Sequence, residues 1–219
     1  AQAEAAKDAA QVAESSAATQ AKRAKQLVDG VDVRAYTFDA LYNKLGYVTQ
    51  KAVLFSGTVE DNVFFGQSAA EKTDASLQAA LSLSQAAEFV DKYPEKAAHP
   101  IAQLGRNVSG GQKQRLSIAR ALARTPEILI FDDSFSALDY KTDAVLREGL
   151  AKQLPGTTKI IVAQRISTIR NADQILVLDR GEIAGLGTHD ELMVSCPVYR
   201  EIAMSQLSEE ELKKGGVSK

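Results

Sequence analysis

Short apolar runs alternate with stretches of helical periodicity along much of the chain. The runs at 127–131 and 158–163 are rich in Ile, Leu and Val, which is typical of buried parallel strands. The segments 113–124 and 144–154 read as helices, the first with its apolar side chains at amphipathic spacing. Pro126 breaks the first helix, and a Pro-Gly pair stops the second. The pattern therefore predicts strands and helices in alternation.

Other strands are predicted before and after this central part. They are residues 27–33 (two short pieces around a turn), 45–49, and 174–178 with a return through 182–185. The run 45–49 ends at Gln50. Residues from about 59 to 97 instead read as a mostly helical subdomain, because their leucines and alanines repeat at helical spacing.

The two ends of the sequence differ from this pattern. Residues 1–25 are close to half alanine and have Val12 as their one larger apolar residue. Alanine favours a helix, but this helix would have almost no apolar stripe with which to pack against the rest of the protein. We interpret this segment as a solvated helix, a linker or a sequence that is not native. Residues 208–219 are charged and are predicted to form a loose tail.

Length and charge narrow the class of protein. A chain of 219 residues is long enough for one sizeable core, and its net charge of −2 gives no global basic field that would indicate nucleic acid. The single cysteine, Cys196, cannot form an internal disulfide. No apolar run approaches the roughly 20 residues that span a bilayer, so any membrane domain is expected elsewhere.

Candidate chemistry concentrates between Asn107 and Asp139. The Ser-Gly-Gly-Gln corner at 109–112 precedes a helix, and it leaves backbone N–H groups at the positive end of the helix dipole, which suits a phosphate. The strand that follows ends on Asp132 and Asp133, where a carboxylate can hold Mg²⁺ beside a nucleotide. Each motif alone also has an ordinary explanation, as a helix cap or a solvated corner.

The order and spacing of these motifs resemble the nucleotide-binding domain of ATP-binding-cassette (ABC) transporters. VSGGQ, a basic helix, an apolar strand ending in two aspartates, and SALD match that family's signature motif, Walker B strand and D-loop. The resemblance runs from about residue 27 to 206, and the phrase LFSGTVEDNVFFG resembles exporters in particular. It implies an α/β fold with a RecA-like P-loop NTPase core, whose mostly parallel sheet is incomplete at the amino terminus. The domain would span 26–207, with a helical signature subdomain at about 51–118.

The resemblance also implies the ligands, ATP and Mg²⁺, and the residues that bind them. Gln50 matches the family's Q-loop glutamine, which touches Mg²⁺ and the attacking water. Asp132 matches the Walker B carboxylate, and so would also hold the metal. The residues that would bind or present nucleotide are Ser109, Gly110, Gly111, Gln112, Ser136 and Asp139.

Three departures from the family pattern predict a site that has ceased to turn over. The sequence contains no Walker A motif, GxxxxGK[ST], so the usual phosphate cradle is expected to be absent. At the catalytic position Asp133 replaces the family's glutamate and is one methylene shorter. Gln164 replaces the switch histidine, and an amide cannot carry a charge or relay a proton. We therefore expect the chain alone to be inactive as an ATPase.

Taken with the resemblance, these features predict the degenerate half of a heterodimeric exporter. Its signature motif would complete the working site of a second nucleotide-binding domain. A transmembrane domain would hold the chain at the cytoplasmic face of the membrane and couple ATP to export; no nucleic acid partner is expected. Two alternatives stay open: a soluble cassette ATPase of another pathway, and a non-catalytic regulatory or interaction fragment. The transported substrate is not readable from this segment.

Overall fold

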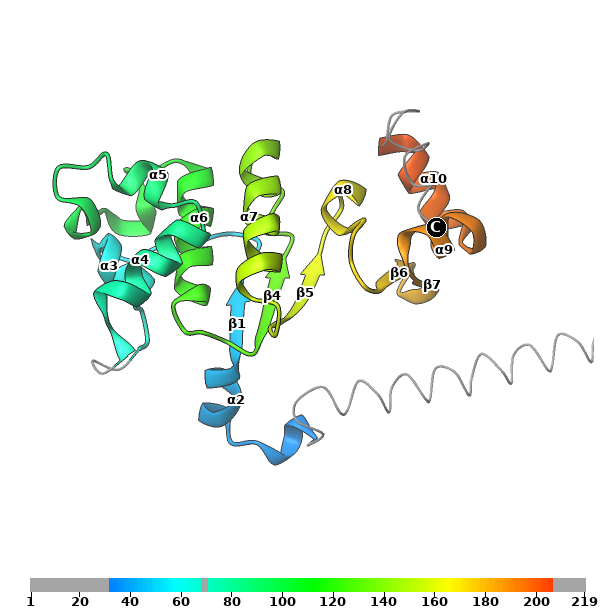
Figure 1. Cartoon of the computed structure of the whole chain (residues 1–219), viewed down its shortest axis with the longest axis horizontal. Helices are drawn as coiled ribbons and strands as arrows, with labels where there is room; N and C mark the ends of the chain where they lie inside the picture. Colours follow the sequence, from blue (N-terminus) through cyan, green and yellow to red (C-terminus); the bar gives the residue numbers. More distant parts are fainter. Residues whose placement is uncertain (1–31, 68–70, 207–219) are drawn as a thin grey trace, which may run out of the picture. The chain divides into compact units, whose positions relative to one another are not determined.

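The computed structural model describes residues 32–67 and 71–206, and the chain divides into two compact units after Lys44 (Figure 1). The predicted helix or linker at 1–25 and the predicted tail at 208–219 lie outside the described residues.

Within its described residues, the first unit contains two short helical elements, η1 (Val33–Ala35) and α2 (Phe38–Lys44). The Asp32 carboxylate accepts the backbone N–H of Arg34 at 2.9 Å and pairs with its guanidinium at 2.6 Å. Local bonds of this kind favour a turn over an extended strand. The second strand-like piece predicted within 27–33 is therefore wrong at Val33, which lies in η1, and the first piece lies outside the described residues.

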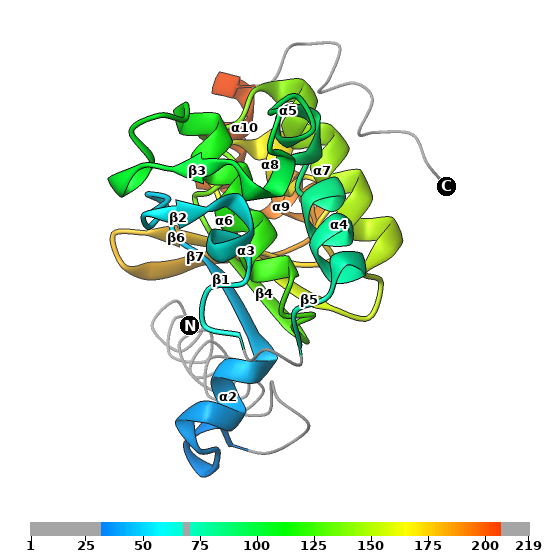
Figure 2. The same ribbon diagram turned by 90° about the vertical axis from the view of Figure 1, so that its left-hand side faces the viewer.

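A three-stranded parallel sheet forms the centre of the second unit. The strands are β1 (Leu45–Val48), β4 (Ile128–Asp132) and β5 (Thr158–Val162). They pair in the order β1–β4–β5, and Figures 1 and 2 both show them side by side. The register places Tyr47 beside Ile130 and Ile130 beside Ile160, so the carboxyl ends of all three strands lie at one edge. The predicted α/β fold with parallel pairing is confirmed.

One face of this sheet packs against helices. Val48, Leu129 and Phe131 are fully buried there, in one core cluster with side chains of α6 (Gly110–Leu122) and α7 (Tyr140–Gln153). Gly46 allows the close approach of β1 to the end of α6, because a Cβ at this position would lie 2.7 Å from the Leu129 side chain and 3.1 Å from the Ala121 carbonyl oxygen. A larger residue at Gly46 would therefore force strand and helix apart.

The opposite face of the sheet is largely open. Tyr47, Ile160 and Val162 are 54%, 41% and 53% exposed. The prediction that 158–163 forms a buried strand is therefore wrong in its burial, although the strand itself is confirmed. The residues of β5 alternate between exposed and half-buried, because no segment of the described chain covers the face that carries Ile160 and Val162.

Helices predominate between β1 and β4, as the sequence predicts. They are α3 (Val59–Val63), α4 (Asp74–Leu83), α5 (Ala87–Val90), the 3-10 turns η3 (Lys96–Ala98) and η4 (Gln103–Gly105), and α6, with a short antiparallel pair of β2 (Gly57–Thr58) and β3 (Pro100–Ile101). α3, α4 and α6 each begin after a Thr or Ser in a capping box. The side chain of the cap residue accepts the backbone N–H of the third helical residue, and the side chain of that residue accepts the backbone N–H of the cap. The cap at Ser109 starts α6 at Gly110, ahead of the predicted 113–124.

The carboxyl-terminal part of the second unit has its own core. A hairpin of β6 (Ile175–Asp179) and β7 (Glu182–Gly187) lies with the helices α8 (Ile166–Ile169), α9 (His189–Ser195) and α10 (Pro197–Gln206). Its buried cluster is formed by Ile166, Ile175, Val177, Leu192, Cys196, Tyr199 and Ala203. The predicted strand and return are confirmed, and α9 begins at His189 after Thr188 caps it.

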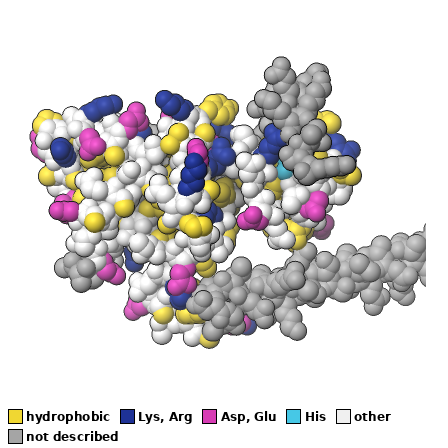
Figure 3. Space-filling view, in the orientation of Figure 1, with side chains coloured by type: hydrophobic (Ala, Val, Ile, Leu, Met, Phe, Trp, Pro, Cys, Tyr) yellow, Lys and Arg dark blue, Asp and Glu magenta, His cyan; other side chains and the backbone are white. Residues whose placement is uncertain are grey.

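On the face drawn in Figure 3, the positive and negative side chains of the described residues are interspersed. No large field of one sign is visible there among them, in keeping with the net charge of −2.

Candidate functional site at the carboxyl edge of the sheet

Polar residues follow the ends of all three parallel strands. Gln50 comes two residues after β1, Asp132 ends β4 with Asp133 next, and Gln164 comes two residues after β5. The register of the sheet brings these segments to the same edge, which is where ligands bind in open α/β sheets. The structure therefore brings together the four residues that the sequence singles out for metal binding and catalysis.

Asp133 is the centre of this group. One oxygen of its carboxylate, Oδ2, accepts the Nε2 of Gln50 at 3.2 Å and the Nε2 of Gln164 at 3.0 Å. Its backbone lies in the left-handed region with φ +45°, where its N–H donates to the Val162 carbonyl at 2.9 Å and its own carbonyl accepts the Ser136 hydroxyl at 2.7 Å. Asp133 is therefore held from both neighbouring strands and from the following loop.

Asp132 makes a different contact. Its Oδ2 accepts the hydroxyl of Tyr47 at 2.9 Å, across the β1–β4 pair. The hydrogen bond to this carboxylate, with smaller contributions from burial and charge, raises the pKa of the Tyr47 hydroxyl, so the phenol stays a donor at neutral pH. Tyr47 was not singled out from the sequence, because its contact with Asp132 joins residues 85 positions apart.

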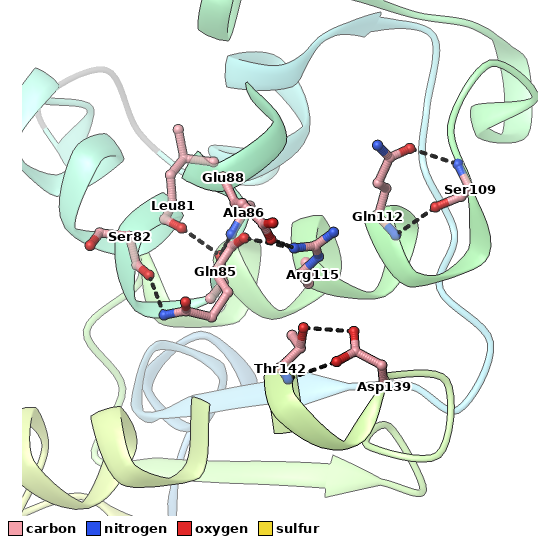
Figure 4. A network of polar contacts seen from close by, with 11 residues as sticks. Leu81, Ser82, Gln85, Ala86, Glu88, Ser109, Gln112, Arg115, Asp139 and Thr142 are labelled. Atoms are coloured by element: carbon pink, nitrogen blue, oxygen red, sulfur yellow. Dashed lines mark hydrogen bonds and ion pairs between the residues drawn. The ribbon is translucent and has the colours of Figure 1, made fainter. Parts of the chain in front are cut away.

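The Ser-Gly-Gly-Gln corner caps α6. Ser109 Oγ accepts the Gln112 N–H at 3.3 Å, and the Gln112 side chain accepts the Ser109 N–H at 2.8 Å (Figure 4). An added Cβ would have open space at Gly110 and only an ordinary contact at Gly111, 3.5 Å from the Ala137 carbonyl oxygen. The corner is exposed or half-exposed, and a ligand can reach the backbone N–H groups of Gly110 and Gly111, which the capping box does not use.

The loop 134–139 joins the sheet edge to α7. Asp139 caps that helix by accepting the Thr142 N–H at 2.9 Å and its hydroxyl at 2.7 Å, as Figure 4 shows. These hydrogen bonds, the backbone N–H of Thr142 first, lower the pKa of the Asp139 carboxyl. Ser136 points back to Asp133, and its carbonyl accepts Arg165 Nη2 at 3.1 Å. In this chain both residues act first as local structural anchors.

Two further contacts tie these loops together and were not predicted. Gln114 in α6 is 1% exposed, and its amide donates to the Thr49 carbonyl at 3.2 Å, directly before Gln50. Arg165 lies with its guanidinium 5.0 Å from the centre of the Tyr140 ring. Gln114 stands one turn before Ile118, which was a signal that this glutamine lies on the buried face of α6.

The donor set at the edge fits a magnesium ion that arrives with a nucleotide. Mg²⁺ prefers carboxylate and carbonyl oxygens and is usually held by one or two carboxylates plus substrate phosphates. Asp132 supplies a carboxylate, and Gln50 turns its amide nitrogen, not its oxygen, toward Asp133. Among the described residues no cluster of three or more His, Cys, Asp or Glu side chains could hold a metal ion by itself.

Comparison with known proteins finds similarity to ABC transporters. A protein-family model described as "ABC transporter" matches residues 15–136. An uncharacterized ABC transporter ATP-binding protein of Mycobacterium tuberculosis is 46% identical over 181 residues, covering 82% of this chain and 31% of the relative. The multidrug resistance protein 1 of Entamoeba histolytica is 40% identical over 186 residues, covering 84% of this chain and 14% of the relative.

A solved structure shares the fold. The structure of a bacterial Atm1-family ABC exporter with ATP bound superposes with a TM-score of 0.78 at 36% identity, covering 84% of this chain and 32% of that one. The chain thus spans about a third of the length of that exporter and of the mycobacterial relative. Within the described residues, no helix combines the length and apolar character needed to cross a bilayer.

Proposed function

Because the chain belongs to the ABC transporter family, we propose that it serves as the nucleotide-binding domain of an exporter and binds ATP with Mg²⁺ at an interface with a second such domain. The observation that carries this proposal is the meeting of Gln50, Asp132, Asp133 and Gln164 at one sheet edge. Asp132 and Gln50 would hold the metal beside the phosphates.

This chain's own site is proposed to be degenerate. Its would-be base, Asp133, accepts two amide N–H groups on one oxygen, so the carboxylate is held by neutral donors that cannot take up a proton from it. A general base must also come within hydrogen-bond reach of its proton, and the aspartate is one methylene shorter than the family's glutamate. Binding and orientation of nucleotide are retained in this arrangement, while turnover is not.

The signature corner is proposed to act on the partner's nucleotide. Residues 109–112 form the start of α6, where the backbone N–H groups of Gly110 and Gly111 are not used by the capping box. The corner lies beside the loop that carries Ser136 and Asp139, since a Cβ at Gly111 would lie 3.5 Å from the Ala137 carbonyl oxygen. Such a helix start stabilises negative charge. The partner is proposed to be a competent nucleotide-binding domain, so that the assembly is a heterodimer. A transmembrane domain would place both at the cytoplasmic face of the membrane and use the ATP cycle for export.

Two substitutions that should differ in their effect on ATPase activity test this proposal, in the complete protein assembled with its partner. Gly111→Asp should lower ATPase activity at saturating ATP by at least about tenfold, because a carboxylate would face the phosphate of the partner's nucleotide. Asp133→Asn should change it by less than about twofold, because its site is already impaired.

We expect Gly111→Asp to leave the fold of α6 intact, so a loss of ATPase activity in this variant would not reflect misfolding. A Cβ at Gly111 meets only an ordinary contact, and an acidic residue in the first turn of α6 stabilises the helix. Gly156→Asp is the matched control, since a side chain at Gly156 has open space and lies away from the site, in the turn after α7. If Asp133→Asn abolishes turnover while Gly111→Asp remains active, this chain holds the working site and the degenerate assignment is wrong.

A further inference from the structure

The last residue of α10, Gln206, holds the backbone on both sides of Arg165. Its amide oxygen accepts the Ile166 N–H at 2.9 Å, and its amide nitrogen donates to the Gln164 carbonyl at 2.8 Å. A side-chain amide carries an acceptor and donors next to each other, so one glutamine can satisfy both groups. The residues joined are 40 and 42 positions apart in sequence, so the contact links two separate segments of the fold.

The held segment, residues 164–166, reaches two parts of the sheet edge. The Gln164 amide donates to Asp133 at 3.0 Å. Arg165 donates to the Ser136 carbonyl at 3.1 Å and lies over the Tyr140 ring. The positions of both side chains therefore depend on where the backbone of this short segment lies.

Apolar packing fixes only one end of the segment. Ile166 is 3% exposed and belongs to the same buried cluster as Tyr199 and Ala203 of α10. Gln164 is exposed and has no such anchor, so the hydrogen bond from Gln206 to its carbonyl is what ties that end to the carboxyl-terminal core. A flexible backbone at this point would let the Gln164 side chain leave Asp133.

We propose that Gln206 is a positioning residue that ties α10 to residues 164–166 and thereby sets how far Gln164 and Arg165 reach into the nucleotide edge. The contact itself is independent of any ligand; its effect on bound nucleotide rests on the function proposed above. Displacement of α10 would withdraw both side chains together, so the carboxyl-terminal helix is a place from which the nucleotide edge can be adjusted.

Three variants of the complete protein separate the two hydrogen bonds. Gln206→Met keeps the length of the side chain and removes both bonds. Gln206→Glu keeps an acceptor for the Ile166 N–H but places a carboxylate against the Gln164 carbonyl. Gln153→Met is the matched control, because Gln153 is likewise an exposed glutamine that ends a helix, α7, but makes no contact with residues 164–166 in the described structure.

Hydrogen exchange at the Ile166 amide, in nucleotide-free protein, reports the contact directly. Gln206→Met should accelerate this exchange about fivefold, the equivalent of one ordinary hydrogen bond, while Gln206→Glu should leave it within about twofold of the wild type. Gln153→Met should have no effect. Unchanged exchange in Gln206→Met would overturn the proposal whether or not the chain binds ATP.

Release of a fluorescent ATP analogue then tests whether Gln206 acts through Gln164. The phase of release that is lost in Asp132→Ala reports this chain's own site. Gln206→Met and Gln206→Glu should both accelerate that phase about fivefold in the wild type but by less than about twofold in a Gln164→Ala background, because coupled residues are not additive. If the Gln206 variants accelerate release equally in the wild-type and the Gln164→Ala backgrounds, Gln206 does not act through Gln164. That result would overturn its assignment as a positioning residue. Absence of any release phase in the wild type, with Ile166 exchange behaving as expected, would contradict ATP binding and leave the tie to residues 164–166 standing.

Discussion

Asp133 occupies a backbone conformation that few side chains tolerate. With φ at +45°, a residue other than Gly, Asn or Asp is strained there, and this residue also serves as acceptor for Gln50 and Gln164. Conformation and hydrogen bonding thus favour the same small set of residue types at the end of β4. An amide or a carboxylate satisfies both demands, whereas an alkyl side chain satisfies neither.

Asp133→Ala should therefore destabilise the protein more than Asp133→Asn. The alanine adds roughly 1 to 2 kcal/mol of backbone strain and leaves two amides without their acceptor, while asparagine keeps an oxygen acceptor and accepts a positive φ. Thermal unfolding of the complete protein should show Tm lowered by about 2 to 8 °C for the alanine variant and by less than about 1 °C for the asparagine variant. Equal Tm values for the two variants would show that neither the strain nor the lost acceptor matters.

At the scale of elements, α9 and α10 are joined by a buried polar pair. His189, the first residue of α9, is 7% exposed, and its Nδ1 lies 2.8 Å from the hydroxyl of Tyr199 in α10. Burial, and then the charge of Arg170, lower the pKa of His189, while Asp190 acts weakly in the other direction. The folded α9–α10 pair therefore favours the neutral form of the His189 imidazole over the protonated form.

The α9–α10 pair should therefore loosen on acidification. Because the pKa of His189 is lower in the folded than in the unfolded chain, its contribution to stability is present above about pH 6.5 and is lost as the pH falls through the lowered value. Backbone amides of α9 and α10 should exchange faster at about pH 5.5 than at about pH 7.5 once intrinsic rates are corrected for. His189→Gln should remove most of this difference; a variant with the same pH dependence as the wild type would exclude His189 as its source.

At the scale of the whole molecule, the second unit has one covered and one open sheet face. The open face carries Tyr47, Ile160 and Val162; in the separate β6–β7 hairpin, Leu178 and Ile183 are also exposed. Exposed apolar strands of this kind favour pairing with other chains. The described residues of the second unit therefore leave apolar side chains exposed to water.

The isolated chain should self-associate through this face. Burial of a few hundred Å² at about 25 cal/mol per Å² is worth several kcal/mol, which is comparable with the stability of a domain. Ile160→Thr together with Val162→Thr should raise the monomer fraction in analytical ultracentrifugation, since threonine keeps the strand preference of the branched residues. Val194→Thr, at a residue of α9 that is 79% exposed, is the matched control. An unchanged association state in the double variant would place the contact elsewhere.

The sequence predicted the strands and helices of the second unit well, because each depends on local pattern. The meeting of Gln50, Asp132 and Gln164 follows from the strands as well, since each residue ends or follows a strand and parallel strands end together. It did not predict the open face of β5, because an apolar run does not say which segments cover it.

The contacts of Tyr47, Gln114 and Gln206 were missed for a different reason. Each joins residues that are 40 to 85 positions apart, and such pairs depend on the register and packing of the folded chain. Local preferences carry no record of them. The motif residues were found because they stand in recognisable strings, whereas the residues that hold the motifs in place are scattered.

The pairing of β1 with β4 has a consequence for the synthesis of the protein. Leu45 pairs with Ile128, which leaves the ribosome roughly 80 residues later, or about 4 to 16 s at ordinary elongation rates. During that interval β1 has no strand beside it in the described part of the chain, because β5 pairs only with β4 and arrives later still. The helices α3 to α5 emerge in between and can form from local contacts. The nascent chain therefore carries an unpaired strand past a growing helical segment, and chaperones that shield extended apolar segments have their longest opportunity to act on residues 45–48.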